Sequence, residues 1–458
     1  MKVLKNKAIY IAPYTPISNA LKIYLTEFYN IDFLGFIDKN KNAENIYKIQ
    51  TIEQKYDFIV IFSPNHFQNI YDEYIKNGIK SSKIIVLEII NQQYKIKQNI
   101  QLKEDEIKTF SLKSPKKQGI VFISKGFIDA NNKYLYLYCY KNNLNPTMIT
   151  DNLAQIKELQ EKGFSILKLD TKEANQKIAG AKYLIFDQAN YTNFYIHENQ
   201  ITIQMWHGVG LKKMSKLTNI VYDYFISTSK WTNETNFKNI FLSKKYLDYG
   251  YPRNEFLLRD TQKSDLLLCD KKLYNISLKN KIVLYMPTIR EYLFSKAETL
   301  ESIINLNLLN LNNSVKKLGY MMIIKLHPHL IEFFKDFIIE SDFSNILFHP
   351  PQGDIYPILK NTDILISDYS SIVYDFLLLD KPIIFFDYDR QEYENNMDGF
   401  LFEYDNYSPG IKVQTQEALI KALTANDQYK EKRTKIKKLF FEDSYQESCK
   451  DIMEIMNR

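Results

Sequence analysis

Short apolar runs alternate with helix-like stretches along almost the whole chain, and this alternation limits the possible fold more than any other sequence feature. One series runs from residue 7 to about residue 90, a second resumes after residue 118, and a third begins near residue 281. Apolar runs of about 4–8 residues separated by helical periods are the pattern of βαβ units around a parallel sheet. The sequence therefore predicts an α/β protein with three Rossmann-like domains.

The domain boundaries follow from the places where the alternation breaks. Residues 91–118 are polar and rich in lysine and lack apolar periodicity, which is typical of a linker. We predict an accessory Rossmann-like domain over residues 1–90, a second α/β domain over 119–260, a third over 261–425, and closing helices with a basic face over 426–458. A chain of 458 residues is long enough for several domains of ~100–200 residues each.

Composition excludes several other classes of protein. Hydrophobic residues make up 45% and charged residues 25% of the chain, as in ordinary globular proteins, so disorder and a coiled-coil rod are both disfavoured. The net charge of +6 is too dilute to indicate a nucleic-acid-binding protein. The most apolar region, residues 364–386, is interrupted by aspartates, so we expect no membrane-spanning helix and at most peripheral membrane contact.

The cysteines and the amino-terminal segment indicate a cytoplasmic protein. Cys139, Cys269 and Cys449 lie far apart without a CxxC pair, which suggests neither a zinc site nor a disulfide framework. The apolar run at residues 8–12 is shorter than the ~7–15 residues of a signal peptide's hydrophobic region. We therefore expect a cytoplasmic location, with room for peripheral contact at the inner face of the membrane, and neither a metal nor a cofactor.

The first turn of the accessory domain lacks a dinucleotide-binding fingerprint. It reads IAPYTPISN, without GxGxxG, so the close backbone approach that a pyrophosphate requires is missing. We interpret this domain as a structural or docking domain.

The most informative stretch of the third domain is an apolar strand that ends at Asp368 and is followed by two serines. Ser370 and Ser371 stand where a helix would begin, so that N–H groups and hydroxyls would converge at a positive helix end and form a phosphate cradle. Asp375 lies one helical turn after Ser371 and could accept hydrogen bonds from ligand hydroxyls. The alternative is a serine N-cap on a core helix, which this segment alone favours because capping serines are commoner.

A second candidate segment, QMWHGVGLKK at residues 204–213, places His207 at a strand exit beside glycines. The glycines leave room for a ligand, and an imidazole pKa of about 6.5 suits proton abstraction at neutral pH. Lys212 and Lys213 add positive charge. The alternative is a His-Gly turn with two solvated lysines.

A third segment delivers Lys325 and His327 on alternate positions at the carboxyl end of a strand, where open α/β sheets bind ligands. His327 and His329 would also allow a metal site, but no Cys or Glu lies nearby at a zinc spacing, so phosphate contact is the favoured interpretation. Arg253 and Arg290 each follow a strand-like or apolar run and would provide fork-shaped donors for phosphoryl oxygens.

These segments occur in one order, and the chain resembles the CDP-glycerol glycerophosphotransferases, the polymerases and primases of teichoic acid and related capsule synthesis. The segments that carry the resemblance are KGFIDANNKYLYLYCY, AKYLIFDQ, QMWHGVGLKK, GYPRNEFLL, YMPTIRE, KLHPH and DILISDYSSIVYDFLLLDKPIIFFDYD. The resemblance covers about residues 119–450 and leaves out residues 1–118. The chain departs from the family pattern at Val209-Gly210, where Thr-Pro is usual, and in lacking an acidic residue after the lysine pair, so donor or acceptor choice would differ.

The resemblance implies a GT-B fold, in which two Rossmann-like halves hold a nucleotide mainly through the carboxy-terminal half. It implies that His207 is the general base for an acceptor hydroxyl, which attacks the β-phosphorus of CDP-glycerol with release of CMP, and that Arg253 and His327 assist. Arg290 is predicted to help hold the developing charge. The other donor-binding positions that it implies are Gly208, Val209, Gly210, Leu211, Pro287, Thr288, Lys325, Leu326, Ser370, Ser371 and Asp375.

We therefore expect a transferase that moves glycerol phosphate, or a related polyol phosphate, from a CDP-linked donor to a hydroxyl of a glycan or lipid-linked acceptor in capsule or teichoic-acid-like polymer synthesis. A metal is not demanded, because cationic side chains and a helix end can hold the charge. Three alternatives stay open: a CDP-ribitol-specific transferase, a GT-B glycosyltransferase that uses a nucleotide sugar, and a capsule-assembly scaffold in which residues 1–110 dock partner proteins.

Overall fold

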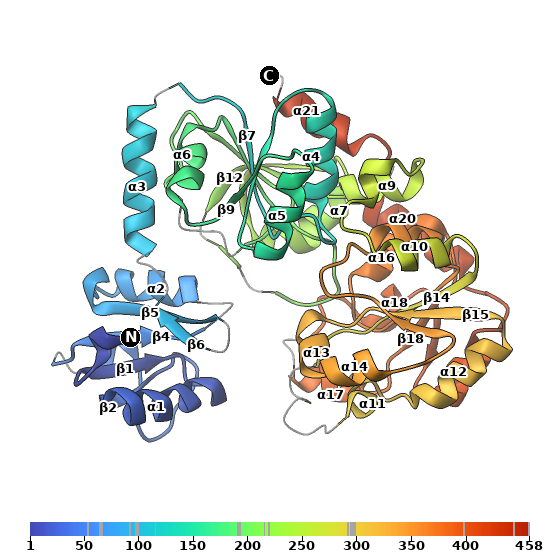
Figure 1. The fold of residues 1–458 in the computed structure, drawn as a ribbon, viewed down its shortest axis with the longest axis horizontal. Coiled ribbons are helices and arrows are strands. Elements are labelled where there is room, and N and C mark those ends of the chain that lie inside the picture. The colour runs from blue at the N-terminus through green and yellow to red at the C-terminus, as the bar shows by residue number, and fades with distance from the viewer. Residues whose placement is uncertain are drawn as a thin grey trace. The chain divides into compact units, whose positions relative to one another are not determined.

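The computed structural model of the protein describes residues 1–52, 55–63, 67–90, 93–96, 100–114, 116–189, 194–214, 216–218, 220–290, 293, 299–396, 399–442 and 445–456. The chain forms two compact units. The first comprises Met1–Lys116, Ile178–Gly180 and Ala189–Glu198, and the second comprises Lys117–Lys177, Ala181–Gln188 and Asn199–Arg458. Within these described ranges, one sheet belongs to the first unit and two belong to the second (Figure 1).

The first unit is built on a six-stranded sheet with the order β3-β2-β1-β4-β5-β6 in the described residues. Its strands are β1 (Ala8–Ala12), β2 (Asp32–Ile37), β3 (Ile46–Tyr47), β4 (Phe58–Ile61), β5 (Ile84–Ile90) and β6 (Gln93–Ile96), and its helices include α1 (Pro16–Tyr29), α2 (Phe67–Lys76) and α3 (Ile100–Lys113). Neighbouring strands are parallel except β6, which is antiparallel to β5. Apolar clusters cover both faces of the sheet, as continuous apolar runs predict.

The stretch predicted as a linker, residues 91–118, contains regular structure in its described part, namely strand β6 and helix α3. Strand β6 is anchored by Tyr94, whose ring lies 4.8 Å from the ring of Tyr24 and 5.4 Å from that of Phe62. Helix α3 buries Ile107 completely. Because each element relies on so few buried apolar side chains, its periodicity is too weak to be recognised in the sequence.

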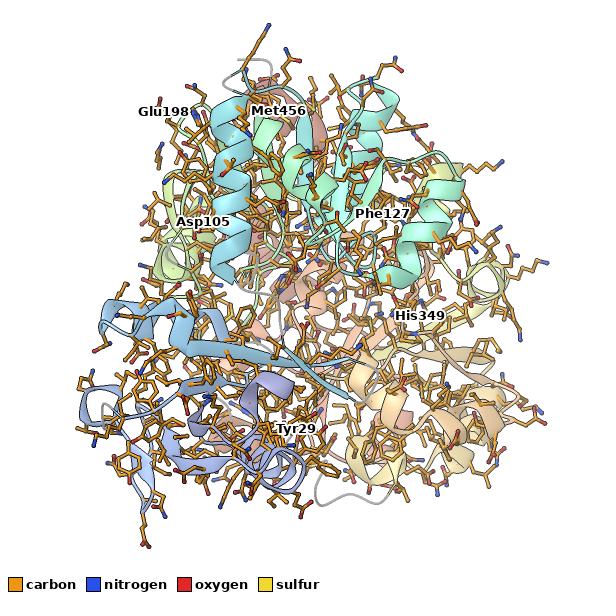
Figure 2. All side chains as sticks on the ribbon, turned by 60° about the vertical axis from the view of Figure 1, so that its left-hand side comes forward. Tyr29, Asp105, Phe127, Glu198, His349 and Met456 are labelled. Atoms are coloured by element: carbon orange, nitrogen blue, oxygen red, sulfur yellow. The ribbon has the colours of Figure 1, made fainter. Side chains whose placement is uncertain are left out.

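The amino-terminal half of the second unit carries a seven-stranded parallel sheet with the order β13-β12-β11-β10-β7-β8-β9. Its strands are β7 (Ile120–Ile123), β8 (Thr147–Thr150), β9 (Ile166–Lys168), β10 (Tyr183–Phe186), β11 (Ile201–Gln204), β12 (Val221–Ile226) and β13 (Leu242–Leu247). Its helices include α4 (Asn131–Lys141), α5 (Leu153–Glu161), α6 (Lys172–Gly180), α7 (Lys230–Thr232), α8 (Lys238–Ile240) and α9 (Pro252–Leu258), although the last three residues of α6 are counted with the first unit. The core of this half also contains Phe127 and Met456, both labelled in Figure 2.

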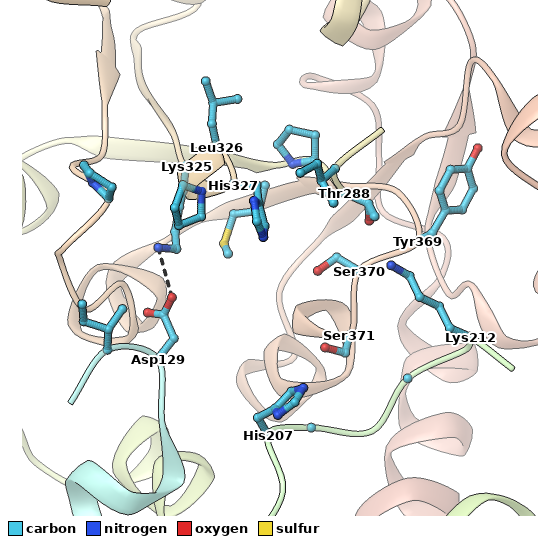
Figure 3. A pocket seen from close by; sticks show the side chains of 18 of the residues that line it. Asp129, His207, Lys212, Thr288, Lys325, Leu326, His327, Tyr369, Ser370 and Ser371 are labelled. Atoms are coloured by element: carbon cyan, nitrogen blue, oxygen red, sulfur yellow. Dashed lines mark ion pairs between the residues drawn. The ribbon is translucent and has the colours of Figure 1, made fainter. Parts of the chain in front are cut away.

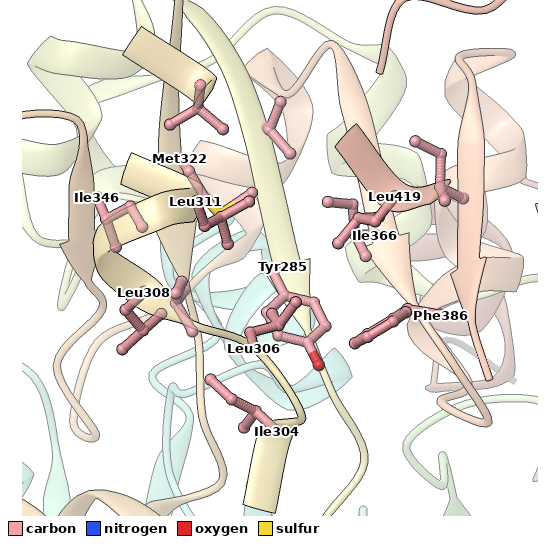
Figure 4. Packing of buried hydrophobic residues seen from close by; sticks show 14 of the residues in the cluster. Tyr285, Ile304, Leu306, Leu308, Leu311, Met322, Ile346, Ile366, Phe386 and Leu419 are labelled. Atoms are coloured by element: carbon pink, nitrogen blue, oxygen red, sulfur yellow. The ribbon is translucent and has the colours of Figure 1, made fainter. Parts of the chain in front are cut away.

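The carboxy-terminal half carries a six-stranded parallel sheet with the order β16-β15-β14-β17-β18-β19. Its strands are β14 (Lys281–Met286), β15 (Tyr320–Ile324), β16 (Ile346–Phe348), β17 (Ile364–Ser367), β18 (Ile383–Phe386) and β19 (Ile411–Val413). Its helices include α10 (Lys271–Ser277), α11 (Leu300–Ile304), α12 (Leu308–Lys317), α13 (Pro328–Phe333), α14 (Lys335–Glu340), α15 (Tyr356–Asn361), α16 (Ile372–Phe376), α17 (Arg390–Asn396), α18 (Tyr404–Tyr407) and α19 (Gln416–Ala422). Strand residues such as Met322, Ile366 and Phe386 pack against helix residues such as Leu311 and Leu419 (Figure 4).

Two closing helices follow, α20 (Lys430–Phe441) and α21 (Ser448–Met456). Helix α21 returns to the amino-terminal half, where Met453 Sδ lies 3.5 Å from Cys139 Sγ in the core. Among the described residues, no helix combines the length and the apolar character that crossing a bilayer would need.

The strand order of each sheet in the second unit reverses beside its first strand. β7 pairs with both β8 and β10, and β14 pairs with both β15 and β17. Ligands bind open α/β sheets at the carboxyl ends of strands beside such a reversal. The predicted α/β class, with Rossmann-like parallel sheets, is confirmed, and the topology marks two strand ends in each half where a site is expected.

Candidate functional site

A pocket of about 440 Å³ lies between the two halves of the second unit. The amino-terminal half contributes Asp129, His207 and Lys212, and Figure 3 shows these side chains across from Lys325 and the serines of the carboxy-terminal half. The volume falls within the range of small-ligand pockets, about 300–1,000 Å³. Cationic and hydroxyl groups from both halves therefore gather around one space suited to an anionic small molecule.

The structure brings most of the predicted site residues to this pocket. Those that line it are His207, Gly208, Gly210, Pro287, Thr288, Lys325, Leu326, His327, Ser370 and Ser371. Those that are buried and do not line it are Val209, Leu211, Arg253, Arg290 and Asp375. The metal alternative for His327 and His329 involves the His329 side chain, which lies outside the described residues.

His207 is presented by a strained turn at the exit of β11. Trp206 and Gly208, on either side of it, have φ values of 50° and 137°, both in the region that favours glycine. Asn131 Nδ2 holds the turn by donating to the Trp206 carbonyl at 3.0 Å. Backbone strain of this kind persists where the surroundings fix it, as at many functional sites.

The hydrogen bond of the His207 ring determines which of its nitrogens can act as a base. Nδ1 lies 3.2 Å from the backbone carbonyl oxygen of Asp187. A carbonyl can only accept, so Nδ1 carries the proton and Nε2 keeps its lone pair. Burial, reinforced by the positive charges of Arg253 and Lys125, lowers the pKa of His207 to about 4. The imidazole is therefore neutral at pH 7 and able to accept a proton.

Arg253 and Asp375 form a buried ion pair behind the His207 turn. Arg253 Nη2 lies 2.7 Å from Asp375 Oδ2, and its Nη1 donates to the Asp129 carbonyl at 3.0 Å. The Tyr356 hydroxyl donates to the same Asp375 oxygen at 2.6 Å. A Cβ added at Gly208 would lie 2.8 Å from Arg253 Nη2, so the turn rests directly on the guanidinium. The geometry gives this pair a supporting position beneath the pocket wall.

Arg290 is likewise held behind the wall. Its guanidinium donates to Asp368 at 2.8 Å and also binds Asp389. Asp368 in turn accepts the N–H of Thr288 at 2.9 Å and its hydroxyl at 2.6 Å. Arg290 therefore fixes the turn that carries Thr288 into the pocket.

Lys325 pairs with Asp129 across the pocket, 3.0 Å apart (Figure 3). Burial by itself would raise the pKa of Asp129, but Lys325 and the backbone amide of Ile355 outweigh that effect and lower it below its ordinary value. Burial also lowers the pKa of Lys212, whose ammonium lies 5.6 Å from the centre of the Tyr393 ring. The pocket thus holds two buried or half-buried lysines and one carboxylate that partly balances them.

The two serines lie at the start of α16, and the Ser371 side chain makes no capping hydrogen bond. Ser371 therefore occupies the N-cap position of α16 without capping the helix through its side chain, and the phosphate-cradle interpretation of the two serines stays a prediction. Figure 3 shows both hydroxyls directed into the pocket. The two hydroxyls can therefore donate hydrogen bonds to a ligand in the pocket, just after the carboxyl end of β17.

The sequence analysis did not single out Ser124, Asp129 or Asp187. Ser124 and Asp187 directly follow the apolar strands β7 and β10, so their position at a strand end was the available signal. Asp129 lies in a loop with a φ of 52° and carried no local signal. Asp129 pairs with Lys325, which lies almost two hundred residues further along the sequence.

Comparison with known proteins gives the family and the fold. The model of the CDP-glycerol:poly(glycerophosphate) glycerophosphotransferase family matches residues 106–456. The teichoic acid poly(glycerol phosphate) polymerase of Bacillus spizizenii is 30% identical over 259 residues, which is 51% of this chain and 63% of that protein. The polymerase of the same name from Staphylococcus epidermidis is 28% identical over 426 residues, 86% of this chain and 55% of that protein. The chain thus spans less than two thirds of the length of these relatives.

A solved structure of the wall teichoic acid polymerase TagF, a variant soaked with CDPG, superimposes with a TM-score of 0.64 at 24% identity over 79% of this chain and 95% of that one. This likeness supports the GT-B type pair of Rossmann-like halves. The family match covers more than half of the sequence, including every residue that lines the pocket. The chain belongs to the CDP-glycerol:poly(glycerophosphate) glycerophosphotransferase family.

Proposed function

We propose that the protein transfers glycerol phosphate, or a closely related polyol phosphate, from a CDP-linked donor to a hydroxyl of a polymer or lipid-linked acceptor and releases CMP. The observation that carries the proposal is the pocket in which a neutral His207 faces Lys325, Thr288, Ser370 and Ser371. A proton acceptor opposite cationic and hydroxyl donors is what attack of an alcohol on a phosphoryl group requires.

The reaction would proceed by direct displacement at phosphorus. The acceptor hydroxyl gives its proton to Nε2 of His207, and its oxygen forms a bond to the β-phosphorus of the donor. The bond from that phosphorus to the oxygen of the CMP phosphate breaks, and CMP leaves with the electron pair. Phosphoryl transfer is mostly a matter of positioning and of stabilising charge on the phosphoryl oxygens.

Each pocket residue has a proposed role in that step. Lys325 and Lys212 would neutralise the diphosphate, which must compete with Asp129 for Lys325. The hydroxyls of Ser370 and Ser371 would donate to its oxygens, with His327 as a further donor, whereas the Thr288 hydroxyl already donates to Asp368. We assign Arg253, Arg290 and Asp375 to support of the pocket wall, because each is already held by buried partners.

The proposal is tested by product analysis. The full chain is incubated with radiolabelled CDP-glycerol and a synthetic glycerol-phosphate oligomer as acceptor, and nucleotides and oligomers are separated by chromatography. We expect CMP to appear in step with an oligomer longer by one or more units. Equal amounts of UDP and a glycosylated product from a parallel UDP-glucose incubation would contradict the proposal and favour the nucleotide-sugar alternative.

CDP-ribitol in the same assay tests the choice of polyol, since it presents the same diphosphate with a longer chain. The docking role predicted for residues 1–110, with capsule-assembly proteins as partners, stays a prediction. Deletion of those residues with retained transfer and lost association with such partners would support it.

A further inference from the structure

Three polar residues follow three neighbouring strands at the point where the sheet of the amino-terminal half reverses its order. Ser124 follows β7, Asp187 follows β10, and His207 lies just beyond β11. The register pairs Ile123 with Phe186, which places Ser124 beside Asp187. The three residues therefore come together by sheet geometry, although they are far apart in the sequence.

A continuous path of hydrogen bonds links them. The Ser124 hydroxyl donates to the Asp187 carboxylate, and both side chains are fully buried. The Ser124 oxygen accepts the N–H of Gly126 at 3.1 Å, which fixes the hydroxyl in turn. The backbone carbonyl of Asp187 accepts from Nδ1 of His207 at 3.2 Å. Asp187 thus touches Ser124 with its side chain and His207 with its main chain.

The Asp187 carboxyl group is an unusual one to find in a protein interior. Its Oδ1 has no hydrogen-bond partner among the described residues. Burial raises the pKa of Asp187 to about 7, although the hydrogen bond from Ser124 and the charge of Lys125 both act to lower it. A buried polar atom without a partner costs about 1–3 kcal/mol, so its presence calls for an explanation beyond packing.

We propose that Ser124 and Asp187 are positioning residues for His207. The Ser124 hydroxyl anchors the Asp187 side chain, which fixes the orientation of the Asp187 peptide, and the carbonyl of that peptide holds the proton on Nδ1 of His207. Nε2 is then kept unprotonated and directed to the acceptor hydroxyl. The proposal rests on the proposed role of His207 as the base.

The charged groups near this path do not provide an equivalent anchor. Lys125 and Asp151 act on Asp187 through their charges, and Arg253 and Lys125 act on His207 in the same way. The Arg253 guanidinium is engaged by Asp375 and by the Asp129 carbonyl. The hydrogen bond that decides which nitrogen of His207 carries the proton is therefore the one to the Asp187 carbonyl.

The direct test measures the tautomer of His207 in the full chain without donor or acceptor. Protein labelled with ¹⁵N-histidine is studied by NMR, and the His207 signals are identified by their loss in His207→Gln. We expect the Nδ1–H form in the unmodified protein and a substantial Nε2–H fraction in Ser124→Ala and Asp187→Ala. Asp187→Asn keeps the shape and a hydrogen-bonding side chain, so it should restore much of the Nδ1–H form.

Kinetics give a second readout. Misplacement of a catalytic base can lower the reaction rate by about 10²-fold. We therefore expect kcat in Ser124→Ala to fall by about 10- to 100-fold, with little change in the KM for the CDP-linked donor. Ser227→Ala is the matched control, because Ser227 is also a buried serine that directly follows a strand of the same sheet, β12, but is linked to the Leu247 carbonyl. It should leave both tautomer and kcat unchanged.

An unchanged Nδ1–H form in both Ser124→Ala and Asp187→Ala would overturn the proposal, whatever the activity. If Ser124→Ala does not fold, Ser124→Cys preserves the volume and weakens the hydrogen bond, and the same spectra apply. Because the spectra need no turnover, a failure of the positioning proposal is distinguishable from a failure of the proposed reaction.

Discussion

The buried ion pair between Arg253 and Asp375 gives a quantitative prediction. The two side chains are only 4% and 2% exposed, and their charged atoms lie 2.7 Å apart. Replacing Asp375 by leucine leaves the guanidinium buried without its counter-ion. Removing one partner of a buried pair costs about 3–5 kcal/mol. A loss of 1 kcal/mol lowers the Tm by about 2–4 °C in a domain of 150–250 residues and by less in a larger one, so Asp375→Leu should lower the Tm of the larger second unit by on the order of 5–10 °C.

A double variant separates the effect of the uncompensated charge from the effect of altered packing. Arg253→Met combined with Asp375→Leu leaves neither charge, so it should recover at least half of the lost Tm. The pair of Lys244 and Asp223, also 2.7 Å apart, serves as a control because its lysine is 67% exposed, and Lys244→Met should shift the Tm very little. Differential scanning calorimetry gives all four values. A shift below 2 °C in Asp375→Leu, or a double variant less stable than the single one, would refute the reasoning.

Four further predictions concern the pocket. His207→Gln should reduce transfer by about 10²–10⁴-fold while CMP binding by calorimetry changes only a few-fold, and full turnover would exclude His207 as the base. The pKa of His207 is lowered to about 4, so roughly 90% of the base is unprotonated at pH 5, against roughly 3% for an ordinary histidine. We therefore expect kcat/KM to stay constant from pH 8 to about pH 5 and to fall below pH 5. A fall in kcat/KM centred near pH 6.5 would contradict this expectation. Lys325→Met should weaken CDP-glycerol binding by about 10- to 100-fold, because the variant loses a charged hydrogen-bonding group. Unchanged affinity in a calorimetric titration would show that Lys325 does not bind CDP-glycerol. Gly208→Ala should lower both Tm and activity, because the φ of 137° at Gly208 and the nearby Arg253 guanidinium leave no room for a Cβ atom. Normal kinetics in this variant would show that the turn adapts to the added atom.

The alternation of apolar runs was sufficient to predict the sheets of the second unit. Strands such as β10 and β17 are buried on both faces and read as continuous apolar runs, which is why the pattern located them. Strand β6 and helix α3 were missed because their described side chains are mostly polar or charged, and the apolar contacts are few, such as Tyr94 in β6 and Ile107 in α3. Periodicity is a weak signal for elements of this composition.

The sequence motifs identified most residues of the pocket, but they could not separate those that face it from those behind it. Arg253 and Arg290 were predicted as phosphate donors because each follows a strand-like or apolar run, and the structure places both behind the pocket wall. Their partners, Asp375 and Asp368, lie 122 and 78 residues further along the chain, and only the fold brings them within 3 Å. The Asp187 carbonyl that orients His207 is a backbone group, which every residue possesses, so no sequence pattern could single it out.

Selective binding of a CDP-polyol by the pocket is the central claim, and it can be measured before an acceptor is known. The full chain is titrated by calorimetry with CDP-glycerol, CDP-ribitol, CMP and UDP-glucose in parallel, with Lys325→Met as the pocket variant. We expect saturable binding of a CDP-polyol at one site per chain, weaker binding of UDP-glucose, and a clear loss of CDP-polyol affinity in Lys325→Met. Preference for UDP-glucose, or CDP-polyol binding that Lys325→Met leaves intact, would contradict it.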